Sequence, residues 1–319
     1  MYMKKNNTKL MKRIISIAPE CLTTQTDGDI FDFETGKDRE TGAVTTCTGS
    51  LDSNLVTYND LIQKVLPGTY IKMGFAITPF DRAVMDAIYT IWSERPDKKS
   101  NICNMAYSDI YKYIMGGSKR NLNRELTYKL KYSVLKLRCI NAWIYIGSDF
   151  PKVAKYFDME EYAEYNEEEA VLHSYLLNCV DFTIKRKNGT CSEGIQVTSC
   201  PILYLYAQAM EQIIGVEDSW LQVLGNCSNK TLAIRDYMIN YIRGLDYCDE
   251  DFAPEIKYKT IFLSAGIPWE ENDYAPSKNR KIVDKMLDSY KKINAIQDYE
   301  VSKDKSKVKI IPTKKKKNK

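Results

Sequence analysis

Seven lysines near the end of the chain have the spacing of a phosphate-binding surface. Four share one flank of a helical segment at intervals of three, four and seven residues, and three more follow between two apolar stretches. The flank consists of Lys278, Lys281, Lys285 and Lys292, and the later group of Lys303, Lys305 and Lys307. Asn279 and Arg280, near the start of the same segment, carry groups suited to reading base edges. The chemistry that these residues predict is nucleic-acid binding.

The positive charge of the chain is concentrated in its last 44 residues. Residues 276–319 hold 15 Lys and Arg against 5 Asp and Glu, whereas the whole chain of 319 residues has a formal net charge of only +4. The first 275 residues therefore carry a net charge of −6. Such concentration predicts a local surface for a polyanion. The lysines at 314–317 are read instead as a disordered basic tail, as blocks of like charge usually are.

The elements that must position these lysines are a helix and a hairpin. Residues 276–293 have a helical apolar pattern, and residues 295–312 read as two strands joined by 302–307. A basic helix followed by a two-stranded wing is the geometry of a winged helix-turn-helix, which lays a helix in the major groove of DNA. The alternative is a solvated helix followed by a disordered lysine tail.

The first half of the chain repeats this order of elements. A helix begins at Thr78-Pro79, where Thr78 can cap and proline suits the first helical position. A second helix, 108–115, stops at two glycines, and a third runs over 119–138 before a strand at 140–146. Helix, helix, glycine turn, helix and strand is the order of a winged helix.

The third helix of this first module is also basic. Arg120, Arg124 and Lys131 lie to one side of its apolar stripe, and the segment holds a single acid, Glu125. Because a generic solvated face usually mixes both signs of charge, we predict that these three residues contact DNA. An ordinary amphipathic helix with a solvated basic face is the alternative.

The wing of the first module is predicted at 179–199, where strands flank the hairpin turn Asn188-Gly189. An acidic segment, 158–169, precedes it and should point away from DNA. The second module is predicted to place its first two helices at 229–245 and 254–265.

The predicted fold class is α+β, mainly helical, with two tandem winged helix-turn-helix modules. Residues 1–54 are predicted to be a flexible N-terminal segment because they are rich in Thr, Asp, Gly and Ser. The first module, with acidic and hairpin insertions, is predicted at 55–215, the second at 216–312, and a basic tail at 313–319.

Several classes of function lack their residues in this sequence. Nine cysteines at irregular spacing and a single histidine, His173, argue against a zinc site and a disulfide framework. No phosphate-binding loop of the nucleotide-hydrolysing type occurs, and no pair of carboxylates stands out. We therefore expect no catalytic residues, no metal and no cofactor. Because no apolar run is long enough to span a bilayer or to form a signal peptide, we expect a cytoplasmic protein without a membrane partner.

Four stretches resemble a known family. Residues 77–91 and 107–117, and later 201–209 and 234–242, are similar to initiator-like proteins of bacterial plasmids and conjugative elements. In layout, residues 55–312 resemble theta-type replication initiators with tandem winged helices. The resemblance implies a protein without its own chemistry, in which one winged helix serves dimerisation and both can contact origin repeats.

The function predicted from these observations is sequence-specific binding of double-stranded DNA by a plasmid or mobile-element replication initiator. A homodimer and host replication proteins are the further partners considered. One alternative is a winged-helix transcriptional regulator of a mobile element, with an operator in place of origin repeats. Another is a structural protein whose winged helices bind other proteins.

Overall fold

The chain is α+β and mainly helical, with small antiparallel sheets. The computed structural model describes residues 2–5, 31–37, 44–51, 78–117, 122–145, 150–159, 171–185, 187–189, 191–209, 213–222, 228–245, 255–265, 267, 269 and 275–313. The chain divides into two compact units: an N-terminal unit of Tyr2–Ile114 and Lys119–Gly215, and a C-terminal unit of Val216–Lys319 with Met115–Ser118 and Met1. No helix among the described residues is long and apolar enough to cross a membrane.

The N-terminal unit is built on three helices and a three-stranded sheet. Its elements in chain order are α3 (Pro79–Glu94), β4 (Cys103–Ala106), α4 (Tyr107–Ile114), α5 (Arg124–Cys139), β7 (Cys179–Lys185) and β8 (Cys191–Val197). The sheet order is β4-β8-β7, and the hairpin β7–β8 turns at Asn188-Gly189, where Gly189 has a φ of 83°. The three helices and the hairpin confirm the elements predicted from sequence, and α5 begins later than expected.

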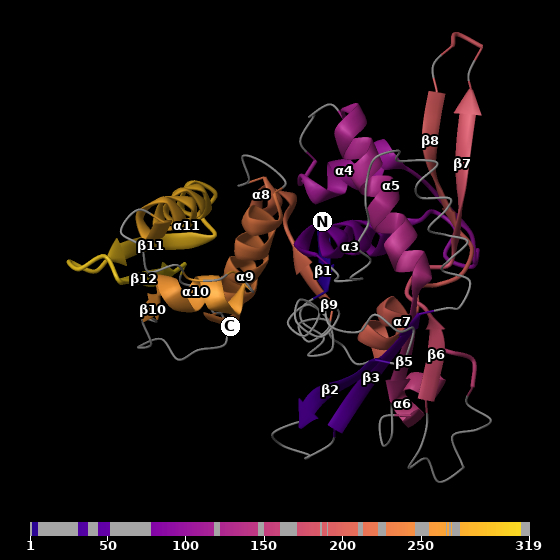
Figure 1. Ribbon diagram of the computed structural model, residues 1–319, viewed down its shortest axis with the longest axis horizontal. Helices are drawn as coiled ribbons and strands as arrows, with labels where there is room; N and C mark the ends of the chain where they lie inside the picture. The colour runs from indigo at the N-terminus through magenta and orange to yellow at the C-terminus, as the bar shows by residue number, and fades with distance from the viewer. Residues whose placement is uncertain are drawn as a thin grey trace, which may run out of the picture. The chain divides into compact units, whose positions relative to one another are not determined.

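The C-terminal unit repeats the same plan. After the short α8 (Asp218–Leu221) come α9 (Asn229–Leu245), β10 (Glu255–Lys257), α10 (Tyr258–Ser264), α11 (Ala275–Lys292), β11 (Ile296–Val301) and β12 (Lys307–Pro312). The sheet order is β10-β12-β11, which matches β4-β8-β7 strand for strand. Figure 1 shows α11 beside the β11–β12 hairpin, both in yellow. The two units are thus a topological repeat.

The strands β4 and β10 were not predicted. Each lies between the first and second helix of its unit and pairs with the last strand of the hairpin, Ile256 opposite Val308 in the C-terminal unit. The residues of β10 were instead predicted to begin a helix. A three-residue strand has too short an alternation to be recognised, and its pairing partner lies about fifty residues away in sequence.

The N-terminal unit contains a second sheet that the sequence analysis did not expect. It has the order β2-β3-β5-β6, formed by β2 (Phe31–Lys37), β3 (Val44–Leu51), β5 (Ile140–Tyr145) and β6 (Val171–Tyr175). The strand β1 (Tyr2–Lys5) pairs with β9 (Ile213–Val216), and α6 (Phe150–Ala154) and α7 (Ile202–Ala209) complete the unit. Where a flexible segment was expected over 1–54, the structure forms β1, β2 and β3, and the Thr-rich β3 finds a distant partner in β5.

Three predicted features lie outside the described residues. These are Arg120, the basic tail at 314–319, and all of the acidic segment 158–169 except its first two residues.

A buried ion pair joins the start of α3 to α5. The Asp81 carboxylate closes a capping box with Thr78, accepting a hydrogen bond from the Thr78 backbone N–H at 2.8 Å. It also accepts from Ser133 and pairs with the Lys136 ammonium group. Asp81 is only 2% exposed and Lys136 6% exposed. Both charges are therefore withdrawn from water, and each depends on the other for compensation.

Replacing Lys136 with methionine should lower the free energy of unfolding by about 3–5 kcal/mol, because it leaves the Asp81 carboxylate buried without its cation. Chemical denaturation followed by circular dichroism measures this change. The control is Lys129→Ala, which removes an exposed pair with Glu125 at 3.0 Å and should cost less than about 0.5 kcal/mol. Equal losses in the two variants would contradict this account of the buried pair.

Candidate nucleic-acid interface

The helix α11 is anchored by its apolar face and ended by a tight turn. Val283, Leu287 and Tyr290 are buried against the core of the C-terminal unit. Asn294, with a φ of 57°, follows the helix in the left-handed region, and the Ala295 N–H donates to the Tyr290 carbonyl at 2.9 Å. This pattern ends the helix and directs the chain straight into β11, so that helix and hairpin are adjacent.

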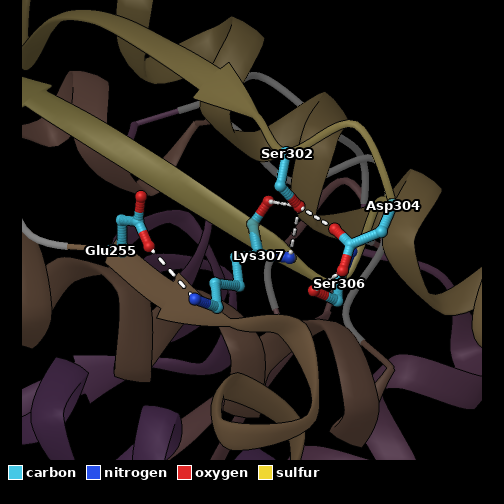
Figure 2. Close-up of polar contacts among 5 residues, drawn as sticks. All are labelled: Glu255, Ser302, Asp304, Ser306 and Lys307. Carbon is cyan, nitrogen blue, oxygen red and sulfur yellow. Dashed lines mark hydrogen bonds and ion pairs between the residues drawn. The ribbon is translucent and has the colours of Figure 1, made fainter.

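The hairpin β11–β12 ends in a turn over residues 302–306. The Ser302 N–H donates to the Lys307 carbonyl at 3.0 Å, and the Lys305 N–H donates to the Ser302 carbonyl at 2.8 Å. Lys305 itself has a φ of 56°, a left-handed backbone conformation that residues other than glycine adopt at a cost in free energy. Figure 2 shows the polar contacts that surround this turn.

A hydrogen bond ties the hairpin tip to α11. The Arg280 guanidinium donates from Nη1 to the backbone carbonyl of Lys305 at 3.2 Å. The first turns of α11 and the tip of the hairpin are thereby held next to each other. The lysines of both segments contribute to one surface for this reason, although about 25 residues separate them in sequence.

Six lysines of this region are exposed and make no ion pair with any residue that the structure describes. They are Lys278, Lys281, Lys285 and Lys292 on α11, and Lys303 and Lys305 at the hairpin tip. We call this set the lysine surface. In contrast, Lys291 pairs with Asp298 at 2.8 Å and Lys309 lies 3.9 Å from Glu300. The positive charge is thus left uncompensated on one row of α11 and at the tip.

Lys307, predicted to contact phosphate, is in a different position. Its ammonium group lies 3.3 Å from the Glu255 carboxylate on the neighbouring strand β10 (Figure 2), and its backbone is part of the turn. A phosphate contact would have to compete with this pair. Its main contribution in the structure is to the β10–β12 pairing.

The structure places Asn279, predicted to reach base edges, in the interior of the unit. Its side chain is 4% exposed, and its amide oxygen accepts a hydrogen bond from the Lys230 ammonium group of α9. A buried amide that already has a partner cannot reach a base edge. Asn279 instead joins α11 to α9, and Arg280 is half-buried and joined to the hairpin.

The acids of α11 are held by tyrosines and not by the lysines beside them. The Tyr258 hydroxyl donates to Asp284 at 2.5 Å, and the Tyr299 hydroxyl donates to Asp288 at 2.8 Å. Partial burial raises the pKa of Asp284, and the Tyr258 hydrogen bond opposes that rise. Because tyrosine hydroxyls satisfy these acids, Lys281, Lys285 and Lys292 are left without an ion pair among the described residues.

The basic residues of α5, the corresponding helix of the N-terminal unit, are largely paired. Lys131 bonds to Glu193 of β8 at 2.7 Å, and Arg138 bonds to Asp181 of β7 at 2.6 Å. These pairs hold the hairpin β7–β8 to α5. The Arg124 guanidinium packs on the Tyr128 ring and donates to its hydroxyl at 3.1 Å, without a carboxylate partner among the described residues. Of the predicted DNA contacts on this helix, only Arg124 is therefore placed with its charge uncompensated.

Other kinds of site find little support in the described part of the chain. No group of three or more His, Cys, Asp or Glu residues there is placed to hold a metal ion. The residues that sequence analysis missed are Tyr258, Tyr299 and Asp304, which hold the carboxylates and the turn around the lysine surface. Tyr258 and Tyr299 are distinguished only by their partners in α11, whereas the serines two residues before and after Asp304 are a local signal that was overlooked.

Comparison with known proteins gives two structural similarities. No protein-family model and no curated protein matches this chain. A crystal structure of domains 2 and 3 of RctB covers 95% of this chain and 96% of its own, at 9% identity and a TM-score of 0.43. A selenomethionine derivative of the same domains covers 88% of this chain and 82% of its own, at 9% identity and a TM-score of 0.39. At TM-scores below 0.5, these similarities do not define the fold of this chain.

Two buried tyrosines of the C-terminal unit should respond differently to loss of the hydroxyl group. Tyr258→Phe removes the donor to Asp284 and should lower the free energy of unfolding by about 1 kcal/mol. The Tyr290 hydroxyl is buried and makes no hydrogen bond with any described residue, so Tyr290→Phe should be neutral or stabilising. Thermal unfolding of both variants measures the difference, and a larger loss for Tyr290→Phe would refute it.

Proposed function

We propose that this chain is a sequence-specific double-stranded DNA-binding protein that acts as a replication initiator of a plasmid or mobile element, without catalysis of its own. Each unit is taken as a winged helix-turn-helix, with α5 and α11 as third helices and the hairpins β7–β8 and β11–β12 as wings. The order of helices and strands in both units supports this assignment. The initiator role rests on the resemblance of residues 77–91, 107–117, 201–209 and 234–242 to initiator-like proteins of bacterial plasmids and conjugative elements.

The observation that carries the proposal is the uncompensated lysine surface. The six lysines of this surface face solvent without a carboxylate partner among the described residues, and Arg280 holds α11 and the hairpin tip together. In a winged helix of this kind, α11 enters the major groove while the wing lysines neutralise backbone phosphates. With α11 in the groove, we assign Lys281 and Lys285 to the backbone phosphates along its edges.

The N-terminal unit has a weaker electrostatic case. Lys131 and Arg138 already have carboxylate partners, so Arg124 is its main candidate for a phosphate contact. We assign DNA binding principally to the C-terminal unit and leave to the N-terminal unit a lesser contact or an association with other proteins, including a second copy or host replication proteins.

Binding to a randomised duplex library across a salt series tests the proposal. Lys281→Ala and Lys305→Ala should each lower the slope of log affinity against log salt by about one unit, because each removes one phosphate contact. Arg124→Ala should change the slope less. The matched control is Lys291→Ala on the same helix, whose ammonium group is engaged with Asp298 and whose loss should leave the slope unchanged.

The outcomes separate the candidate functions. Enriched sequences that occur as direct repeats beside an AT-rich segment support an initiator, and a palindrome over a promoter supports a transcriptional regulator. Affinity without enrichment of any sequence would remove the claim of specificity. If the parent protein shows no salt-dependent affinity for duplex DNA, the winged helices serve protein contacts and the proposal fails.

A further inference from the structure

One carboxylate lies at the centre of the basic hairpin tip. Asp304 is exposed and lies between Lys303 and Lys305, two members of the lysine surface. Its negative charge opposes the attraction of phosphate at the very position where a wing would approach DNA. A residue that weakens a surface in this way needs a compensating role.

The contacts of Asp304 provide that role (Figure 2). Its Oδ1 atom accepts hydrogen bonds from the Ser302 hydroxyl at 2.5 Å and from the Ser306 backbone N–H at 3.1 Å, and its Oδ2 accepts from the Ser306 hydroxyl at 2.7 Å. Ser302 in turn accepts from the Lys307 N–H at 3.0 Å. One side chain thus joins both ends of the turn.

The same hydrogen bonds keep the carboxylate ionised. Those from Ser302 and Ser306 lower the pKa of Asp304 below its ordinary value. A depressed carboxylate pKa stabilises the folded turn above the unfolded pKa of about 4, and this contribution is lost as pH falls through the folded value. At neutral pH the carboxylate is therefore in the ionised form that accepts these hydrogen bonds.

A second contact fixes the tip from the other side. The Lys305 carbonyl, in the left-handed residue of the turn, accepts the hydrogen bond from Arg280 of α11 at 3.2 Å. The backbone that carries Lys303 and Lys305 is thus restrained from within by Asp304 and from the helix by Arg280. Two flexible lysines on a fixed backbone lose less conformational freedom on binding than two on a mobile loop.

We propose that Asp304 is a positioning residue of the DNA surface, which holds the wing tip in one conformation at the expense of local positive charge. The inference rests on the proposed function and makes its partner more specific. A fixed tip suits the regular phosphate spacing of a duplex, whereas a flexible polyanion requires only charge. The tip is therefore built to select duplex DNA over other polyanions.

Two substitutions with the same charge test the inference. Asp304→Asn and Asp304→Ala each remove one negative charge, but the Asn amide can still accept from Ser302 and from the Ser306 N–H. Asp304→Asn should bind duplex DNA at least as tightly as the parent. The affinity of Asp304→Ala for duplex DNA should be lower than that of Asp304→Asn by a factor of about three or more, because its lysines must be ordered on binding. On a heparin column the two variants should elute at the same salt concentration.

A measurement without DNA reports on the turn itself. In the full chain, amide hydrogen exchange of Ser306 should be about tenfold faster in Asp304→Ala than in the parent, since the N–H loses its charged acceptor. Asp304→Asn should keep most of the protection. Ser306→Ala, which removes only one hydroxyl donor, should give an intermediate rate and serves as a milder variant.

The results distinguish this inference from the proposed function. Equal duplex affinity of Asp304→Asn and Asp304→Ala, or an unchanged Ser306 exchange rate in Asp304→Ala, overturns the positioning role while DNA binding stands. If Asp304→Asn and Asp304→Ala differ as much in their binding to heparin as in their binding to duplex DNA, the proposed selection of duplex DNA is overturned. If no variant and not even the parent binds duplex DNA, the proposed function fails together with the inference.

Discussion

In each unit, a short strand between the first two helices pairs with the last strand of the hairpin, and the remaining geometry depends on this pairing. In the C-terminal unit Ile256 of β10 lies opposite Val308 of β12, and both side chains are buried. Without this strand the hairpin would lose its strand partner and be attached through its connection to α11 and its packing on α11 and α9. With it, the hairpin becomes part of a sheet whose position relative to the helices is fixed. The placement of the tip lysines follows from a strand of three residues.

The two units share this plan and use their charges differently. In the N-terminal unit, cations of α5 pair with acids of the hairpin, so that charge serves to join helix to sheet. In the C-terminal unit the Tyr299 hydroxyl meets Asp288 of α11 and the Lys305 carbonyl meets Arg280, and one ion pair, between Lys291 and Asp298, adds to this joining. The other ammonium groups of α11 are left to face an external anion. With the same topology, the N-terminal unit pairs cations of α5 with acids of its hairpin, whereas the C-terminal unit leaves most lysines of α11 exposed to solvent.

The C-terminal surface also shows how acids can be kept within a basic region. Asp284, Asp288 and Asp304 all accept hydrogen bonds from hydroxyl groups, and none of them pairs with a lysine of the lysine surface among the described residues. A hydroxyl donor satisfies a carboxylate without consuming a cation. Each acid therefore has a structural role, and the cost is a modest reduction of the local potential.

The sequence by itself determined the long helices, their order and the two hairpins. Thr78 and Pro79 start a helix through local capping, and Asn188-Gly189 and the segment 302–306 form turns through short-range backbone preferences. The clustering of lysines on one flank of α11 was equally legible, because a helical period converts sequence spacing directly into a face.

The tertiary structure decided which of those residues are available. Asn279 is buried and bonded to Lys230, and Lys131 forms an ion pair with Glu193. Tyr258 donates a hydrogen bond to Asp284. In each case the partner lies more than 20 residues away in sequence. The tertiary structure also recruited β3 into a sheet with β5, where composition had indicated a flexible segment. Local preferences act over a few residues and are visible in a sequence, whereas burial and pairing depend on which distant segments meet. The sequence therefore gives the number and spacing of the lysines, whereas only the tertiary structure shows which of them remain exposed and unpaired.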